Sequence, residues 1–300
     1  MDKSLEKLSE GFRKGQVNRR EFIQRVVLAA GGIVAAGHVL RKLGFDPGLV
    51  REAQAEGAKI ETMDLTYPSS DGDVDAYLAK PVGEGPFPAM IVIHEIFGLS
   101  EFAKDVARLF ARNGYLALAP HFPEGGGALP DGKHAQWMLD TIRTGTAVVP
   151  DDEQDKLRDG FIFLSQRSDV DPTHIASVGF CWGGARSFTF ATRNPDLWAA
   201  VVFYGSTPPL DDLDAIQAPV LGLYGGLDNG SPTSITGRSA ETAREMVARG
   251  KIFEWEVYNQ APHGFFRADA PPGTRIADTR PALIAKDLVF DFLERHYDRG

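Results

Sequence analysis

The spacing of apolar and polar residues changes repeatedly from residue 59 onward. Short runs rich in β-branched and aromatic residues alternate with longer stretches whose apolar residues recur at helical spacing. The runs predict strands at 60–67, 74–80, 89–94, 115–119, 175–180, 199–204, 220–224 and 253–258, and helices at 101–113, 151–166, 182–193, 233–249 and 281–296. This alternation is typical of a mainly parallel sheet with helices on both faces. We therefore predict a single α/β domain over residues 56–300.

Residues 122–150 interrupt this alternation. The stretch is rich in Gly and Pro and predicts a long loop or cap with one short helix around Trp137. Its segment 127–133 matches the first part of a phosphate-binding loop. However, His134 stands where Ser or Thr is required, and Pro130 lacks an N–H group that phosphates need. We therefore interpret this segment as a loop without nucleotide chemistry.

The first 55 residues have a different pattern from the body. A charged stretch leads to Asn18-Arg19-Arg20, followed by a mildly apolar run over 26–40, which is shorter than the roughly 20 residues of a membrane span. Paired arginines before an apolar run, with an Ala-Gln-Ala sequence at 53–55, resemble a twin-arginine export signal. We expect export to the periplasm. Membrane anchoring by an uncleaved signal, a cytoplasmic location, and an amphipathic helix that packs on the body remain alternatives.

Composition and charge exclude several functions. Hydrophobic residues make up 43% and charged residues 24% of the chain, which is ordinary for a globular protein. Lys and Arg total 32 against 41 Asp and Glu, so the net charge is −9 and nucleic acid is not an expected partner. A single cysteine excludes an internal disulfide and any multi-cysteine zinc site, and we expect neither metal nor cofactor.

The segment Gly179-Phe180-Cys181-Trp182-Gly183-Gly184 carries the first candidate for chemistry. It lies between a predicted strand and a predicted helix, which is the context of a nucleophile elbow. Flanking glycines permit a sharp turn, and the helix N-terminus favours a thiolate and an oxyanion. The alternative is a buried structural cysteine beside a packing turn.

Two partners follow Cys181 in the order expected of a hydrolase triad. Asp228 comes just after the strand at 220–224, and His263 comes just after the strand at 253–258. Both therefore leave the carboxyl ends of strands, where ligands of an open α/β sheet bind. Each could singly be a turn or loop residue. Their joint order and spacing predict a Cys181-His263-Asp228 triad.

A further loop is expected beside the elbow. Glu95 follows the apolar strand at 89–94, and Gly98 excludes an H-E-x-x-H zinc motif. The backbone N–H groups of Ile96 and Trp182 are the predicted oxyanion hole. Glu95 is predicted to bond the thiol or compete for it, or alternatively to bond nearby backbone. His94 is predicted to line the pocket.

These motifs together resemble the dienelactone hydrolase (carboxymethylenebutenolidase) family, and the resemblance extends from about residue 60 to the C-terminus. It implies an α/β-hydrolase fold, with Cys181 as nucleophile, His263 as general base and acid, and Asp228 orienting the histidine. It also implies that Glu95 contacts the resting thiol, and that Arg267 binds a substrate carboxylate. A second arginine of the family has only Arg143 as a candidate. The motifs that carry the resemblance are H-E-I-F-G at 94–98, G-F-C-W-G-G at 179–184, G-G-L-D at 225–228 and H-G-F-F-R at 263–267.

The resulting hypothesis is a hydrolase that cleaves a lactone or ester through a thioester on Cys181. The family pattern Asp-Leu-Tyr after the fourth strand is replaced here by His121-Phe122-Pro123, which leaves the natural substrate open. Glutamine amidotransferases also use a cysteine elbow, but their glutamate two residues after the histidine is replaced here by Phe265. The other alternative is an exported, non-catalytic α/β binding protein with a buried cysteine.

Overall fold

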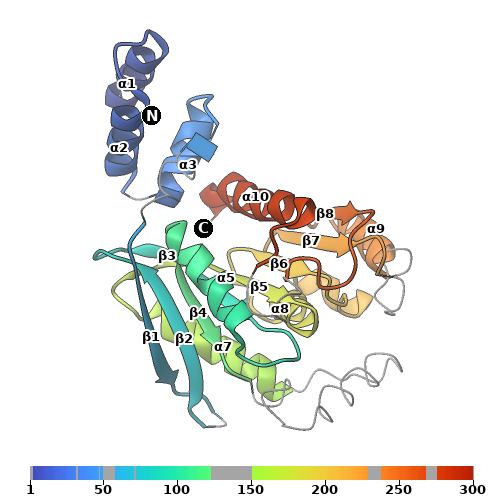
Figure 1. Ribbon diagram of the computed structural model, residues 1–300. Coiled ribbons are helices and arrows are strands. Elements are labelled where there is room, and N and C mark those ends of the chain that lie inside the picture. The colour runs from blue at the N-terminus through green and yellow to red at the C-terminus, as the bar shows by residue number, and fades with distance from the viewer. Residues whose placement is uncertain are drawn as a thin grey trace.

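Eight strands form one twisted sheet in this computed structural model (Figure 1). The structure describes residues 3–31, 33–46, 48–49, 58–70, 72–122, 151–228, 238–267 and 276–299. The strands lie in the order β1-β2-β4-β3-β5-β6-β7-β8. Only the β1–β2 and β2–β4 pairs are antiparallel, and the other five pairs are parallel. The strands are β1 (Ile60–Tyr67), β2 (Val74–Pro81), β3 (Phe87–Ile93), β4 (Leu116–Pro120), β5 (Val170–Phe180), β6 (Ala200–Phe203), β7 (Val220–Gly225) and β8 (Phe253–Tyr258).

Helices cover both faces of this sheet, as the alternating pattern predicts. Helices α5 (Glu101–Arg112) and α10 (Arg280–Arg295) pack on one face, where Phe102, Phe110 and Phe290 join a large apolar cluster. Helices α7 (Asp151–Ser165), α8 (Trp182–Arg193) and α9 (Ala240–Ala248) cover the other face. The central strands β3 to β7 are almost wholly buried because both faces are covered, which explains their continuous apolar runs.

The predicted elements agree with the observed ones to within one or two residues along most of the body. A short 3₁₀-helix, η2 (Leu210–Ala215), and a C-terminal one, η4 (Tyr297–Arg299), were not predicted. The predicted start of the helix at 233 lies outside the described residues, as do Trp137, the apparent phosphate loop at 127–133 and most of the predicted cap.

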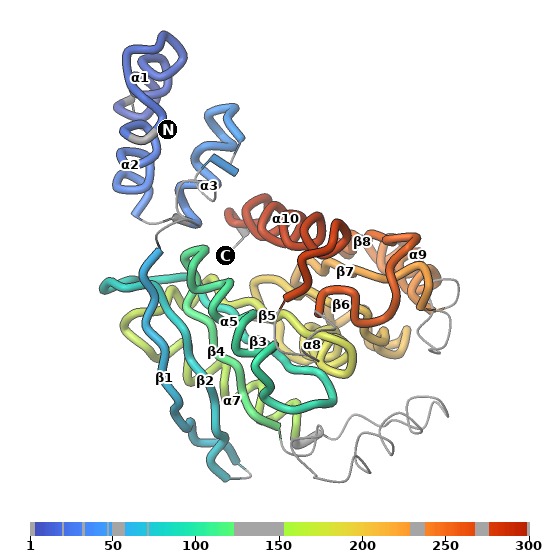
Figure 2. The backbone as a smooth tube through the Cα atoms, viewed as in Figure 1, coloured from blue at the N-terminus to red at the C-terminus, as the bar shows by residue number. Residues whose placement is uncertain are grey.

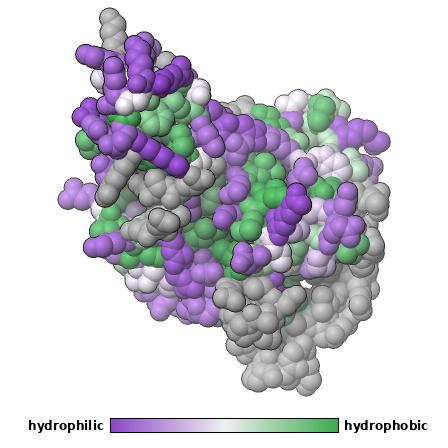
Figure 3. All heavy atoms as spheres, turned by 45° about the horizontal axis from the view of Figure 1, so that its top comes forward, coloured by the Kyte–Doolittle hydropathy of each residue, from purple (hydrophilic) through white to green (hydrophobic). Residues whose placement is uncertain are grey.

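Three helices precede the sheet: α1 (Lys3–Arg13), α2 (Arg19–Ala30) and α3 (Ile33–Lys42). They have an apolar cluster of their own, and Asn18 begins α2 by accepting a hydrogen bond from the Glu21 N–H at 2.9 Å. Figure 3 shows many hydrophilic side chains on the visible face of this part of the molecule, although Leu28 of α2 is 84% exposed. The amphipathic arrangement therefore buries its apolar face internally. The proposed cleavage sequence at 53–55 lies outside the described residues.

Helix α3 joins this N-terminal unit to the body by packing beside α10 (Figure 2). The His38 imidazole bonds the Glu294 carbonyl through Nδ1 at 3.1 Å. Arg41 pairs with Asp291, and Lys42 lies 2.8 Å from a carboxylate oxygen of Asp298. Packing of the N-terminus on the body, one of the alternatives left open by the sequence, is thus present.

In the described part of the chain, no individual helix has both the length and the apolar content that crossing a bilayer requires. The segments Glu21–Ala30 and Val34–Lys42 meet that criterion only when taken together, and they are bent by 108° at their junction.

Candidate active site

The sharp turn between β5 and α8 places Cys181 at the carboxyl edge of the sheet. Its backbone has φ 56° and ψ −116°, a conformation that is strained for a residue with a side chain. The turn is closely packed. A Cβ on Gly183 would lie 2.3 Å from the His94 carbonyl oxygen, and one on Gly179 would lie 1.9 Å from the Gly183 carbonyl oxygen. Both glycines are therefore required by backbone contacts, and Cys181 is left partly exposed rather than buried in the core.

His263 and Asp228 meet beside this turn. The His263 Nδ1 lies 2.7 Å from the Asp228 Oδ2, and the Asp228 side chain is only 9% exposed. Their two loops are joined by the backbone, because the Gly226 N–H donates to the Tyr258 carbonyl and the Leu227 N–H donates to the Ala261 carbonyl, each at 2.9 Å. The carboxylate is thus held in place by the ends of two neighbouring parallel strands, β7 and β8.

The Cys181 side chain lies close enough to His263 to influence its titration, so the three predicted triad residues are neighbours. Burial lowers the pKa of His263, but the hydrogen bond to Asp228 and the nearby Asp228 and Cys181 side chains outweigh it and raise the pKa to about 10. These neighbours stabilise the protonated form of the imidazole, so His263 is suited to accept a proton from the thiol and to return it during a reaction.

Glu95 lies buried on the other side of the site, with 3% of its surface exposed. Its Oε2 is 3.4 Å from the Arg267 Nε, and the Arg267 guanidinium also lies 4.7 Å from the centre of the Phe97 ring. Burial raises the pKa of Glu95, and the positive charges of Arg267 and His263 only partly offset this effect. The predicted contact of Glu95 with the thiol stays a prediction, since the recorded partner of the carboxylate is Arg267.

The two predicted oxyanion donors are buried and available. Ile96 is 4% exposed and Trp182 is 2% exposed. Within the described ranges, neither backbone N–H has a hydrogen-bond acceptor. Backbone N–H groups of buried residues rarely lack a partner, so the structure leaves both groups free for the predicted role, which stays a prediction. The close approach of Gly183 to the end of β3 brings the two donor segments together.

Tyr204 is a residue of this site that the sequence reasoning missed. It follows β6, has a positive φ of 39°, and packs edge-on against the His263 ring with the ring centres 4.9 Å apart. Burial raises the pKa of its phenol, and the negative charges of Glu95 and Cys181 add to this rise. Its hydroxyl has no hydrogen-bond partner among the described residues. Its position at the end of a parallel strand was the available signal.

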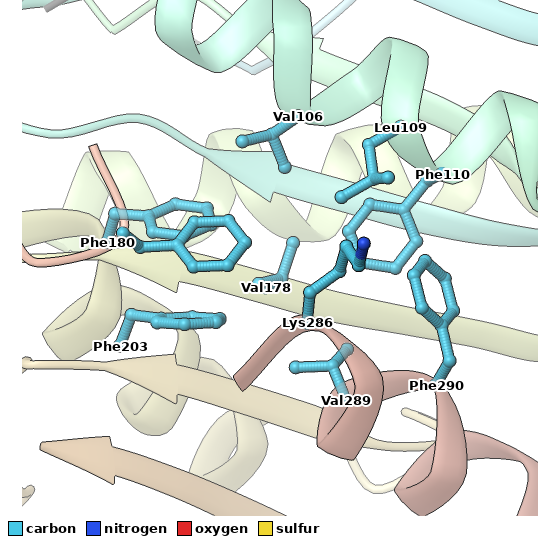
Figure 4. Close-up of a pocket in the computed structure, with 10 residues that line it drawn as sticks. Val106, Leu109, Phe110, Val178, Phe180, Phe203, Lys286, Val289 and Phe290 are labelled. Atoms are coloured by element: carbon cyan, nitrogen blue, oxygen red, sulfur yellow. The ribbon is translucent and has the colours of Figure 1, made fainter. Parts of the chain in front are cut away.

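Three phenylalanines form the floor below these residues. Phe180, Phe203 and Phe266 each immediately precede a site residue, namely Cys181, Tyr204 and Arg267. Phe180 stacks on Phe203 at 4.7 Å and on Phe266 at 5.6 Å between ring centres. A cavity of about 10 Å³ adjoins them in the core (Figure 4) and is lined by Val106, Leu109, Phe110, Val178, Phe180, Phe203, Phe266, Lys286, Val289 and Phe290.

The structure places His94 differently from the prediction and does not describe Arg143. The prediction that His94 lines the pocket is wrong, because its side chain is fully buried below the loop. Arg143, the candidate second arginine, lies outside the described residues. No group of three or more His, Cys, Asp or Glu side chains able to hold a metal ion occurs in the described parts of the chain.

Comparison with known proteins agrees with the class that the sheet and the elbow define, the α/β-hydrolase fold. A solved structure from Klebsiella pneumoniae, titled "Putative Dienelactone Hydrolase", has a TM-score of 0.64 and 27% identity, and the match covers 78% of this chain and 98% of that one. The profile of the Dienelactone hydrolase family matches residues 74–296. This chain belongs to the dienelactone hydrolase family.

Curated relatives support this assignment. A protein of Methylorubrum extorquens is 35% identical over 223 residues, which cover 71% of this chain and 74% of that protein. A protein of Salmonella typhimurium is 36% identical over 227 residues, covering 72% of this chain and 81% of that protein. Both carry the name "Putative carboxymethylenebutenolidase". The chain is thus a dienelactone hydrolase-like hydrolase, as its motifs predict.

The glycine at the elbow provides a stability test. We expect Gly183→Ala to lower the free energy of unfolding by about 2–3 kcal/mol, because the added methyl meets two backbone carbonyls that cannot move away. Gly250→Ala is the control, because Gly250 has φ 66° but open space around it. This variant should lose only the cost of the left-handed backbone conformation, about 1 kcal/mol of unfolding free energy. Urea unfolding measures both. Equal losses in the two variants would contradict the contact argument.

The burial of Glu95 provides a test by pH. The pKa of Glu95 is raised in the folded state, so at pH values above the ordinary pKa of a glutamate the folded chain binds more protons than the unfolded chain. The free energy of unfolding therefore decreases as the pH rises. We expect Glu95→Gln to be more stable than the parent at pH 8, with a smaller advantage at pH 5. Urea unfolding at both values measures this, with exposed Glu256→Gln as control. An advantage that grows at low pH would refute the assignment.

Proposed function

We propose that this chain hydrolyses a small ester or lactone, of the dienelactone-like and carboxylate-bearing kind, through a Cys181-His263-Asp228 triad. The observation that carries the proposal is the short bond between Asp228 and His263 beside a cysteine held at a strained strand-to-helix turn. A cysteine that served only as core packing would not require this backbone conformation.

The proposed reaction has two halves. The imidazole of His263 removes the proton from the Cys181 thiol, and the thiolate adds to the carbonyl carbon of the substrate. The carbonyl oxygen becomes an oxyanion that accepts hydrogen bonds from the Ile96 and Trp182 N–H groups. Collapse breaks the bond to the leaving oxygen, which takes the proton from His263, and leaves a thioester. Water then attacks the thioester with His263 again as base, which releases the acid and the thiol.

The preference for a carboxylate-bearing substrate is supported by Arg267. Its guanidinium is 27% exposed, faces the buried Glu95 without an ideal hydrogen bond, and is held over Phe97. A substrate carboxylate offers this guanidinium a bidentate partner, which is a stronger interaction than the present one. The names of the relatives, which refer to a butenolide bearing a carboxymethylene group, are consistent with such an anion.

The nucleophile is tested directly by substitution. We expect Cys181→Ala to abolish hydrolysis of cis-dienelactone and p-nitrophenyl acetate, because no thioester can form. A spectrophotometric assay measures turnover, and intact mass measures the acyl adduct on the parent chain. Asn259→Ala, a substitution in an exposed loop position, serves as the folded control. Full activity of the Cys181→Ala variant would refute the mechanism.

A non-catalytic binding protein is the competing proposal. It requires that the thiol be inert and that the parent chain turn over neither substrate. The partial exposure of Cys181 and its proximity to His263 support the enzyme instead. Iodoacetamide separates the two, because a thiolate at an elbow is alkylated rapidly and a structural thiol is not.

We further propose that residues 1–55 direct the chain out of the cytoplasm. The proposal rests on the paired Arg19 and Arg20, placed directly before the apolar run. In a Gram-negative host, we expect the wild-type chain in the periplasmic fraction, and the double variant Arg19→Lys with Arg20→Lys in the cytoplasm, because such signals require both arginines. Arg41→Lys is the matched control outside the pair. Equal distribution of all three proteins would contradict export by this route.

A further inference from the structure

His94 lies fully buried next to the loop of Glu95 and Ile96. Its Nδ1 is 2.6 Å from the Glu95 carbonyl oxygen, and its Nε2 is 3.1 Å from the Phe122 backbone nitrogen. The carbonyl can only accept, and the N–H can only donate. Nδ1 therefore carries the proton and Nε2 carries the lone pair, so a single neutral tautomer satisfies both bonds.

The surroundings of His94 keep it in this neutral form. Burial lowers its pKa to about 4, the hydrogen bond to the Glu95 carbonyl opposes this effect, and the positive charges of His121 and Arg186 add to it. Both ring nitrogens are occupied and no part of the ring is exposed. His94 therefore cannot transfer a proton to a substrate from this position. Its two hydrogen bonds instead suit it to holding the loop of Glu95 and Ile96.

The bond to Glu95 determines the direction of the neighbouring N–H. The Glu95–Ile96 peptide is trans, and in a planar trans peptide the C=O and N–H point in opposite directions. A carbonyl held toward the His94 ring thus directs the Ile96 N–H away from the ring. The Gly98 N–H also donates to this carbonyl, but over a longer 3.3 Å, so His94 makes the shorter of the two bonds.

His94 also contacts the residue that supplies the second donor. Its ring lies nearly parallel to the Trp182 indole, with centres 5.5 Å apart and an angle of 11°. The indole is held in turn by Arg186, whose guanidinium carbon lies 4.1 Å from the ring centre and whose Nε bonds the buried Glu153 at 2.8 Å. One side chain therefore contacts both the segment of Ile96 and the segment of Trp182.

We propose that His94 is a positioning residue that aligns the Ile96 N–H, and holds the Trp182 segment beside it, as the oxyanion hole. The inference rests on the proposed acyl transfer through Cys181. On this proposal, His94 affects every reaction step that passes through an oxyanion, although it does not contact the substrate. It does not affect reactions of the thiolate in which no oxyanion forms.

Two reactions of the same thiol test the proposal. Acylation by p-nitrophenyl acetate passes through an oxyanion, whereas alkylation by iodoacetamide does not. We expect His94→Phe to slow acylation at least about tenfold, toward the 10²–10³-fold cost of a lost oxyanion donor, with alkylation unchanged. His94→Gln should retain most of the acylation rate, because its amide can donate to the Glu95 carbonyl and accept from the Phe122 N–H.

The control is His174→Phe, a second buried histidine that bonds backbone and stacks on an aromatic ring, but near the start of β5 rather than at its carboxyl end. It should lose comparable stability and keep both rates. Equal slowing of acylation and alkylation in His94→Phe, or unchanged acylation, would overturn the positioning role alone. A parent chain that is alkylated but never acylated would instead overturn the proposed function, and this inference with it.

Discussion

The active site depends on the strained backbone of Cys181. A residue with a side chain at φ 56° costs on the order of 1–3 kcal/mol, so this conformation persists only because its surroundings enforce it. Here the enforcement is contact between backbones, with the first turn of α8 seated against the ends of β3 and β5 at the two glycines of the turn. The same contact leaves Cys181 partly exposed and brings the loop of Glu95 beside the turn. A single packing constraint therefore sets the positions of the proposed nucleophile and of both proposed donors.

The candidate site contains two pairs of oppositely charged or titratable side chains. His263 bonds Asp228 and lies near Cys181, while Glu95 faces Arg267. Each buried carboxylate thus has a cation as neighbour, which limits the penalty for removing charges from water. The arrangement is uneven, however, because the bond to Asp228 is short and the contact to Arg267 is long and poorly aligned. The His263–Asp228 pair is therefore suited to holding a proton. The Glu95–Arg267 pair is suited to separating when another anion binds Arg267.

The sequence predicted the sheet and the helices, and the proximity of Asp228 and His263, because these leave local signals. Buried parallel strands read as apolar runs, and the residue after each strand falls at a common edge. Tyr204 was missed because an aromatic residue at the end of a strand is ordinarily part of the core. His94 was placed wrongly for a related reason: the spacing puts it at the strand end, but only tertiary contact turns its ring into the protein. Contacts between distant segments, such as α3 with α10, have no signature in local spacing.

The stacked phenylalanines below the site limit which of its positions can be changed one at a time. Phe180, Phe203 and Phe266 interlock three chain segments, and each ring is followed directly by a residue of the reactive centre. A change of size in one ring shifts the other two, and with them the sulfur, the phenol and the guanidinium together. Substitutions at exposed positions beside the site, such as Phe97 and Leu227, would instead leave this aromatic packing in place.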